Sequence, residues 1–262
     1  MIIRKYSSGR PSIERLIENE DLGIEILHPG GLALTVEFAR LCGVREDAQV
    51  LEVASGTGET SCLLTSEFGA HVTCLDLSSL MLLRARSKAR RRALQVGWVR
   101  GDAHALPFAD SLFDAVLSEC TLCYLDKPRA LREMVRVARP GAAVGIHDLC
   151  WQPGTPEQVK QRLRELEDEE PETREGWRAL FEGAGLITIE VQDRSDVIPD
   201  WIRGTRSQLG VLGYVRIAAT VLQTWGLHGL RSVLASERIF ASPHLGYALI
   251  IGRKPGPEPK ST

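Results

Sequence analysis

Residues 49–58 read QVLEVASGTG, a short apolar run that leads into two alternating glycines. The run predicts a buried strand over 49–54, and a helical pattern follows the glycines over 59–68. Gly56 and Gly58 carry no Cβ, so the backbone of this turn can come close to a ligand. The N-terminus of the next helix adds unpaired N–H groups and favours an anionic group such as a carboxylate. We therefore interpret residues 49–68 as a ligand-binding strand–turn–helix unit.

The same alternation continues along the chain and predicts an α/β fold. Right-handed crossovers would join the strands into a doubly wound, mostly parallel, seven-stranded sheet with helices on both faces, plus a helical cap. The predicted strands are 49–54, 71–76, 96–100, 113–118, 143–147, 186–191 and 246–252. The predicted helices are 30–42, 59–68, 79–94, 157–170, 174–184, an apolar stretch over 199–238, and one that Asp126 caps and residues 139–141 end.

One domain is expected over 30–253. Segment 1–29 is expected to close over the site, and the proline-rich end, 254–262, to be disordered. The insertion 199–238 between the last two strands is a candidate lid, because long insertions in compact domains are usually functional. An extra packing layer or a dimer surface remains an equal alternative for it.

Composition argues against several classes of function. The chain has 32 Lys and Arg against 34 Asp and Glu, a net charge of −2, which disfavours a globally basic nucleic-acid binder. No apolar run approaches the roughly 20 residues of a membrane span. No secretory signal is visible, and six cysteines suit a reducing cytoplasm. We expect a cytoplasmic monomer or homodimer that acts on a small molecule.

A ribose site is predicted at Asp76, which ends the second strand about 20 residues after the glycine turn. A carboxylate at that position can accept hydrogen bonds from both ribose hydroxyls. The alternative is that Asp76 caps the next helix, in competition with Ser78 and Ser79. Ser61 stands where the dinucleotide fingerprint requires a third glycine, so the pattern disfavours a pyrophosphate.

Several ordered motifs resemble those of one enzyme family. Residues 50–58, together with CLDLS at 74–78, resemble motif I and the ribose segment of class I S-adenosylmethionine (SAM)-dependent methyltransferases. GDAHALPF at 101–108 resembles the adenine-side segment of that family. FDAVLSE at 113–119 and ALREMVRVARPG at 130–141 are similar to later motifs of the branch that contains the ubiquinone/menaquinone methyltransferases. The resemblance covers residues 30–150 and implies a Rossmann-like fold, SAM as cofactor and S-adenosylhomocysteine as product.

The resemblance also implies roles for individual residues. Glu52 would lie near the methionine moiety, Asp76 would bind the ribose, and Asp102 would bind the adenine amino group. Leu77 would form an apolar wall against the adenine. The full set of implied cofactor residues is Glu52, Ala54, Ser55, Gly56, Gly58, Asp76, Leu77, Asp102, Ala103 and Glu119. Ala54 departs from the family pattern, which usually has glycine there, and adds a methyl group near the methionine end.

The acceptor is expected beyond the carboxyl ends of the fourth and fifth strands, where ligands of open α/β sheets bind. Those ends read ECTLCY over 119–124 and HDLC over 147–150. The candidate catalytic residues are Glu119, His147 and Cys120. Asp148 and His104 are further candidate bases by location. His28 could close over the site together with Tyr6, or could simply be a turn residue before Pro29.

Three cysteines leave the acceptor open. Cys120 and Cys123 have CxxC spacing, and Cys150 lies near the end of the fifth strand, so these thiols could bind a thiol or metalloid acceptor. The alternative is that they are ordinary buried cysteines. A zinc site would need a fourth ligand, and therefore no metal site is predicted. The leading hypothesis is methyl transfer to a quinone-like, phenolic or other natural-product acceptor, and a further alternative is SAM binding without methyl transfer.

Overall fold

The strands form one sheet in the order β3-β2-β1-β4-β5-β8-β7, and the short β6 pairs with β5. Strand β8 is antiparallel to both neighbours, and the other strand pairs are parallel. The computed structural model describes residues 28–256, apart from the side chains of residues 205, 206 and 208. The strands are β1 Gln49–Val53, β2 His71–Asp76, β3 Gly97–Arg100, β4 Phe113–Glu119, β5 Ala138–Trp151, β6 Glu172–Thr173, β7 Ile187–Asp193 and β8 Leu245–Arg253.

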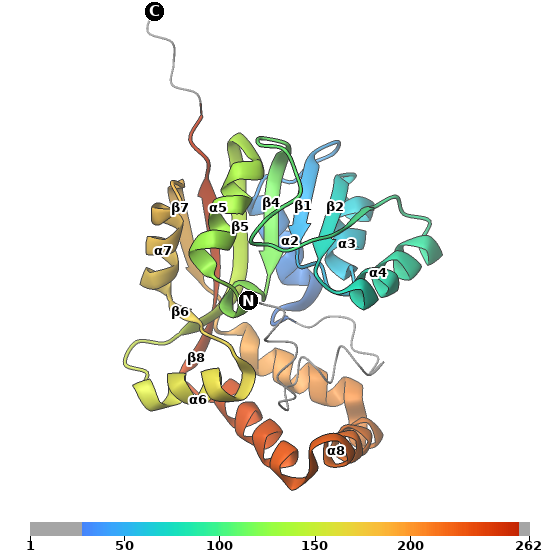
Figure 1. Ribbon diagram of the computed structural model, residues 1–262, viewed down its shortest axis with the longest axis vertical. Helices are drawn as coiled ribbons and strands as arrows, with labels where there is room; N and C mark the ends of the chain where they lie inside the picture. The colour runs from blue at the N-terminus through green and yellow to red at the C-terminus, as the bar shows by residue number, and fades with distance from the viewer. Residues whose placement is uncertain (1–27, 257–262) are drawn as a thin grey trace, which may run out of the picture.

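Helices cover both faces of this sheet (Figure 1). The helices of the described residues are α2 Gly31–Leu41, α3 Glu59–Phe68, α4 Ser79–Arg91, α5 Lys127–Val137, α6 Glu157–Glu167, α7 Arg174–Gly183 and α8 Val197–Phe240, with a short 3-10 helix, η2, at Leu122–Tyr124. Successive side chains of a strand point to opposite faces. Val50 of β1 therefore packs in the core with α2 and α3, and Leu51 packs in the core with α5 and α7. The predicted doubly wound α/β fold is confirmed.

Most predicted elements lie within a few residues of their positions in the structure. Helix α3 and strand β2 have the predicted bounds. Asp126 caps α5, because its side chain accepts a hydrogen bond from the Arg129 N–H. Strand β5 begins at Ala138 rather than at residue 143, because α5 passes directly into the strand instead of ending at the proline–glycine pair. Strand β6 was not predicted, since two residues carry no recognisable period.

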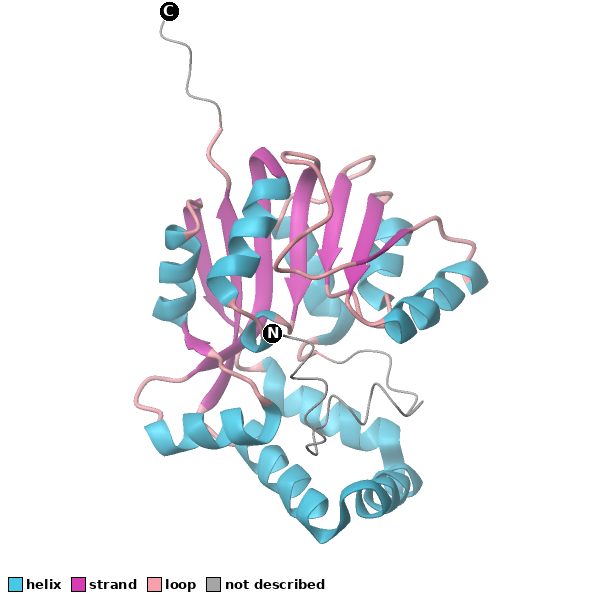
Figure 2. Ribbon diagram, in the orientation of Figure 1, coloured by secondary structure: helices cyan, strands magenta, loops and turns pink. Residues whose placement is uncertain are grey.

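The insertion α8 and helix α6 lie beyond the carboxyl ends of the parallel strands (Figure 2). Gly210 and Gly226 have non-helical backbone angles inside α8, so the insertion consists of three helical pieces. Within residues 28–256, no helix combines the length and apolar character that crossing a membrane requires. The proposed closing segment 1–29, except for His28 and Pro29, lies outside the described residues, as do Tyr6 and residues 257–262 of the tail.

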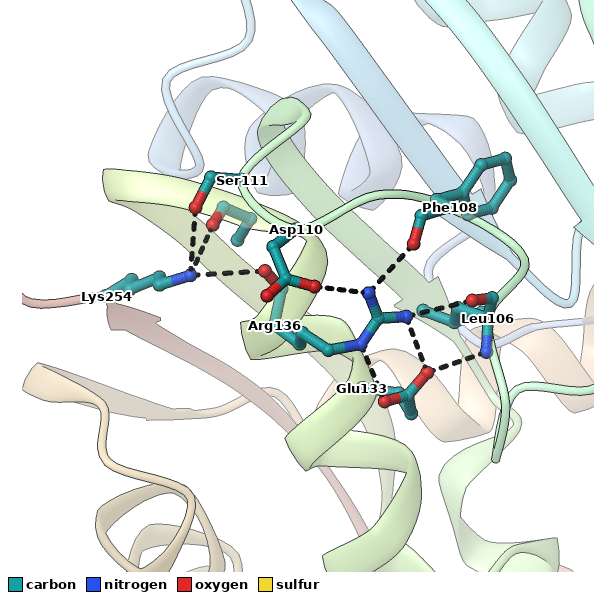
Figure 3. A network of polar contacts seen from close by, with 8 residues as sticks. Leu106, Phe108, Asp110, Ser111, Glu133, Arg136 and Lys254 are labelled. Carbon is teal, nitrogen blue, oxygen red and sulfur yellow. Dashed lines mark hydrogen bonds and ion pairs between the residues drawn. The ribbon is translucent and has the colours of Figure 1, made fainter.

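A hydrogen-bonded network around Arg136 of α5 holds the loop that follows β3 (Figure 3). The guanidinium donates to the carbonyls of Phe108 at 2.8 Å and Leu106 at 2.9 Å, and it forms ion pairs with Glu133 and Asp110. Glu133 in turn accepts the Leu106 N–H at 2.8 Å. Arg136 belongs to the motif over 130–141, and its hydrogen bonds tie that motif to the segment over 101–108. It fixes the loop that carries Asp102.

Candidate active site

The glycine turn after β1 has the shape of a ligand cradle. Ala54, Gly56 and Gly58 all have positive φ, at 60°, 51° and 72°. A Cβ on Gly58 would lie 2.7 Å from the Cβ of Ala85, whereas a Cβ on Gly56 would meet nothing within 4 Å. Gly58 is therefore needed for packing α4 against the turn. Gly56 instead leaves open space on the side where a cofactor would bind.

Asp76 is fixed beside this turn. Its Oδ2 accepts the Gly56 N–H and its Oδ1 accepts the Ser78 N–H, both at 2.8 Å, and only 9% of the residue is exposed. Ser78, not Asp76, caps α4, because the Ser78 hydroxyl accepts the Met81 N–H. The carboxylate is thus held in one orientation at the carboxyl end of β2, as a ribose-binding residue requires. The capping alternative for Asp76 is not what the structure shows.

Glu52 is buried at the carboxyl end of β1 and accepts a hydrogen bond from the Ser61 hydroxyl. Burial, and then the charge of Glu119, raise the pKa of Glu52 well above its usual value. The sequence showed Ser61 only as a missing glycine, but the structure shows it as a partner of Glu52. A bound cation would favour the charged form of this glutamate, which suits the predicted position near the ammonium and sulfonium groups of SAM.

Asp102 and His104 form a fixed pair on the predicted adenine side. Asp102 Oδ1 accepts the His104 N–H at 2.9 Å and lies 2.7 Å from Nδ1 of the same ring. Burial would raise the pKa of Asp102, but these contacts with His104 outweigh it and lower that pKa. Nε2 of His104 accepts the Asp126 N–H at 3.0 Å. The lone pair of Nε2 is therefore already used within the fold, so His104 is poorly placed to act as a base.

The remaining predicted cofactor residues lie around the same edge. Ser55 and Ala103 are buried, and Leu77 is half-buried directly after Asp76. The open space at Gly56, the fixed carboxylate of Asp76 and the anchored loop of Asp102 together fit a nucleoside-containing cofactor.

A second group of side chains surrounds Glu119 at the end of β4. Glu119 and His147 are paired neighbours in the register of β4 and β5, and Glu119 Oε1 lies 2.7 Å from His147 Nε2. Glu119 Oε2 lies 3.3 Å from His28 Nε2 and accepts the Thr60 hydroxyl at 2.5 Å. The Glu119 side chain is 7% exposed and that of His147 is fully buried. Burial opposes the charge of Glu119, but His147, His28 and Thr60 hold its pKa at about 2.

Tyr247 of β8, which no sequence pattern marked as a site residue, extends this group. Its hydroxyl contacts His147 Nδ1 and lies 3.0 Å from Cys120 Sγ. His147 is opposite Leu249 in the antiparallel pair of β5 and β8. Tyr247 is two residues from Leu249, so it points to the same face as His147 as a diagonal neighbour. Only the register reveals this contact, and the sequence contains no signal for it.

The three cysteines of interest do not form one site. Cys120 packs against the core cluster on the α2 face of the sheet, and Cys150 lies in the cluster on the α7 face. Burial raises the pKa of Cys120 and Cys123 well above the usual range and that of Cys150 to about 12. All three are free thiols. Their separation on two faces argues against a three-cysteine metalloid site.

Asp148 has a structural role beside this group. Its Oδ2 accepts the N–H groups of Thr121, Leu122 and Cys123 at 3.1, 2.7 and 3.3 Å. Three donors of one turn on one oxygen fix the backbone that follows Glu119. Asp148 therefore shapes the loop after β4 rather than facing an acceptor.

Residues 51–146 match the family model described as a methyltransferase domain. The chain is 30% identical over 176 residues to an uncharacterized protein of Haemophilus influenzae, which covers 64% of this chain and 70% of that protein. It is 38% identical over 113 residues to the ubiquinone/menaquinone biosynthesis C-methyltransferase UbiE of Roseobacter denitrificans. That match covers 42% of this chain and 45% of UbiE. The chain spans about a third of the plant phosphoethanolamine N-methyltransferases that it also matches.

Solved structures share the fold at low sequence identity. Phosphoethanolamine N-methyltransferase 2 of Haemonchus contortus, solved with SAM, has a TM-score of 0.73 at 19% identity and covers 92% of this chain and 56% of that one. The [4+2]-cyclase SpnF has a TM-score of 0.69 at 21% identity, and the match covers 86% of this chain and 82% of SpnF. The sheet order, the cofactor cradle and the matched domain agree, and we conclude that the chain belongs to the class I SAM-dependent methyltransferases.

Proposed function

We propose that this methyltransferase acts on a small phenolic or quinone-like acceptor whose nucleophile must lose a proton. The observation that carries the proposal is the chain of contacts from Glu119 through His147 to Tyr247 at the carboxyl ends of the strands. Acid–base residues help methyl transfer only when the acceptor is a hydroxyl, a phenol or an acidic carbon. An acceptor that is already a good nucleophile would need no such group.

The location of Glu119 supports this assignment. Its carboxylate accepts the hydroxyl of Thr60, which lies in the first turn of α3 directly after the glycine turn. Glu119 also interacts electrostatically with Glu52, the residue predicted near the methionine moiety. The acid–base group therefore adjoins the predicted methyl-donor end of the cofactor site. Bound SAM supplies an activated methyl group, and the protein's task is to orient the nucleophile and exclude water.

In this mechanism, His147 holds the acceptor's proton. Nε2 of His147 faces the Glu119 carboxylate, and Nδ1 contacts the Tyr247 hydroxyl. A proton that reaches Nε2 makes an imidazolium, which the ionised Glu119 stabilises. Tyr247 keeps the ring in orientation from the other side. Glu119 is thus the electrostatic partner, His147 the base and Tyr247 the positioning residue.

Kinetics of S-adenosylhomocysteine formation with a panel of phenols and quinols would test the proposal. We expect Glu119→Gln and His147→Asn to lower kcat about 100-fold, the lower end of the range for a lost general base. His147→Asn should keep its affinity for SAM within about twofold. His71→Gln, on an exposed residue at the start of β2, is the matched control. Unchanged kcat in both site variants would overturn the proposal.

A triple variant with serine at Cys120, Cys123 and Cys150 tests the thiol or metalloid alternative. Because Cys120 and Cys150 pack on opposite faces of the sheet, we expect turnover of phenolic acceptors to survive in this variant. Loss of turnover, with SAM affinity retained, would favour the cysteine alternative instead.

A further inference from the structure

We infer that His28, Glu119 and His147 bind a divalent transition-metal ion on the acceptor side of the cofactor. The inference deepens the proposed function, since it rests on the same acceptor site and adds the group that would activate the acceptor. The sequence did not predict this site, because its three ligands come from three separate segments and include no CxxC pair.

The donor atoms have suitable spacing. One ligand atom from each of the three residues lies within 4.8 Å of the others. His28 Nε2 is 3.3 Å from Glu119 Oε2, and His147 Nε2 is 2.7 Å from Glu119 Oε1. With metal–donor bonds of about 2.1 Å, two donors lie about 3.0–3.4 Å apart around an ion. The first spacing already fits, and the second fits after an opening of a few tenths of an ångström.

The opposite nitrogen of each histidine ring is already engaged. His28 Nδ1 lies 3.2 Å from the carbonyl oxygen of Pro29. A carbonyl oxygen only accepts, so the proton of neutral His28 is on Nδ1 and Nε2 carries a lone pair. His147 Nδ1 contacts the Tyr247 hydroxyl. Metal-binding histidines typically use the second ring nitrogen in this way, which fixes the tautomer and the ring orientation.

Two of the donor atoms are also unsatisfied. Glu119 Oε1 and His147 Nε2 are buried, and among the described residues neither has a hydrogen-bond partner, although the two atoms are close in space. Their orientation does not place a proton between them. Buried polar atoms normally have a partner, and a bound ion is one recognised explanation for an exception. Both atoms point to one place, where a cation would satisfy them together.

The charge of the site favours a cation. Within residues 28–256, the ion-pair partners of Glu119 are the two histidines, and no lysine or arginine contacts it. Two neutral imidazoles and a carboxylate leave one negative charge in a buried place. Two histidines and one carboxylate with open positions form a donor set typical of catalytic Zn²⁺ and Fe²⁺.

Such an ion would change how the acceptor loses its proton. The ion would take the acceptor's oxygen at an open position and lower the pKa of that hydroxyl. The hydroxyl proton would then pass to water, the new O–CH₃ bond would form, and the S–CH₃ bond would break to leave neutral S-adenosylhomocysteine. With the ion bound, His147 Nε2 is a ligand and no longer the base. The acceptor class is thus narrowed to molecules that offer an oxygen to the metal.

Absorption titration of the full chain with Co²⁺, after treatment with a chelator, tests the site directly. We expect one Co²⁺ per chain, with visible d–d bands, displacement by Zn²⁺, and no thiolate-to-metal band. His28→Gln, Glu119→Gln and His147→Gln should each weaken Co²⁺ binding at least tenfold, by analogy with the losses seen for residues around metal sites. His71→Gln and Cys123→Ser should leave it unchanged. A far-ultraviolet circular dichroism spectrum of every variant shows that each one is folded.

Three results would overturn the inference: no saturable Co²⁺ or Zn²⁺ binding by the wild-type chain, equal binding by His28→Gln and His71→Gln, or binding lost with Cys123→Ser. The metal site and the proposed function can fail separately. Absence of metal binding by a chain that still turns over phenols overturns the metal site and leaves the acceptor class standing. Metal binding by a chain that turns over no protic acceptor overturns the acceptor class and leaves the metal site standing.

Discussion

The backbone at Ala54 stores strain inside the cofactor turn. Its φ is 60°, in the left-handed region, where a Cβ costs about 1–2 kcal/mol and glycine has no such cost. The sequence predicts that Ala54 adds a methyl group near the methionine end of the site. In the structure it is also a strained residue at a position where the family pattern has glycine. Strain of this kind is common at ligand-binding sites.

Ala54→Gly should therefore raise the free energy of unfolding by about 1 kcal/mol, because relief of the left-handed strain exceeds the added entropy of the unfolded chain. Urea denaturation monitored by circular dichroism measures the change. Ala93→Gly is the matched control, since Ala93 has a φ of 54° and lies on the exposed surface after α4. A loss of stability in Ala54→Gly alone would show that the Ala54 methyl group makes a packing contact worth more than the strain.

At the level of elements, local sequence patterns predicted those helices and strands whose bounds depend only on their own residues. The strand–turn–helix unit β1–α3 and the capped start of α5 follow from apolar runs, glycines and Asp126 alone. The length of β5 and the existence of β6 were not predictable in this way. Both depend on neighbours, since β5 gains pairs from β8 along its whole second half and β6 exists only as a partner of β5.

The pairing of Arg136 with Glu133 makes stability depend on pH. Hydrogen bonds from Arg136 are the main cause that lowers the pKa of Glu133 from its ordinary value of 4.5. The unfolded chain therefore binds this proton more readily than the folded one. The contribution to stability is present above pH 4.5 and is lost as the pH falls through the lower folded-state pKa.

Glu133→Gln should then flatten the fall of stability below that pH and cost about 1 kcal/mol near pH 7, a modest value because the pair is partly exposed. Urea denaturation at a series of pH values gives both quantities. Glu182→Gln, on an exposed side chain of α7, serves as the control. An unchanged pH profile in Glu133→Gln would mean that the network holds the loop without contributing to acid stability.

For the whole molecule, the strands that carry the predicted cofactor residues were predictable, and the contacts around Glu119 were not. Gly56 and Asp102 follow β1 and β3, and Asp76 ends β2, so the strand order predicts that these residues lie along one edge of the parallel sheet. Tyr247 and His28 reach Glu119 and His147 from β8 and from the residues before α2. Their approach depends on an antiparallel register and on the path of the chain over the sheet, which no local pattern records.

The cofactor site should couple to the stability of the whole domain. A ligand that binds only the folded chain stabilises it, by about 2.7 kcal/mol at 100 times its Kd. For a chain of this size, that corresponds to a rise in Tm of about 5–10 °C.

We expect SAM and S-adenosylhomocysteine to produce this rise in the wild-type chain and in Asp47→Ala, whose side chain is exposed. Asp76→Ala should show no rise, because it removes the carboxylate fixed beside Gly56. NADH should have no effect, since Ser61 replaces the third glycine of a pyrophosphate site. A shift with NADH, or one that persists in Asp76→Ala, would place the cofactor elsewhere than this turn.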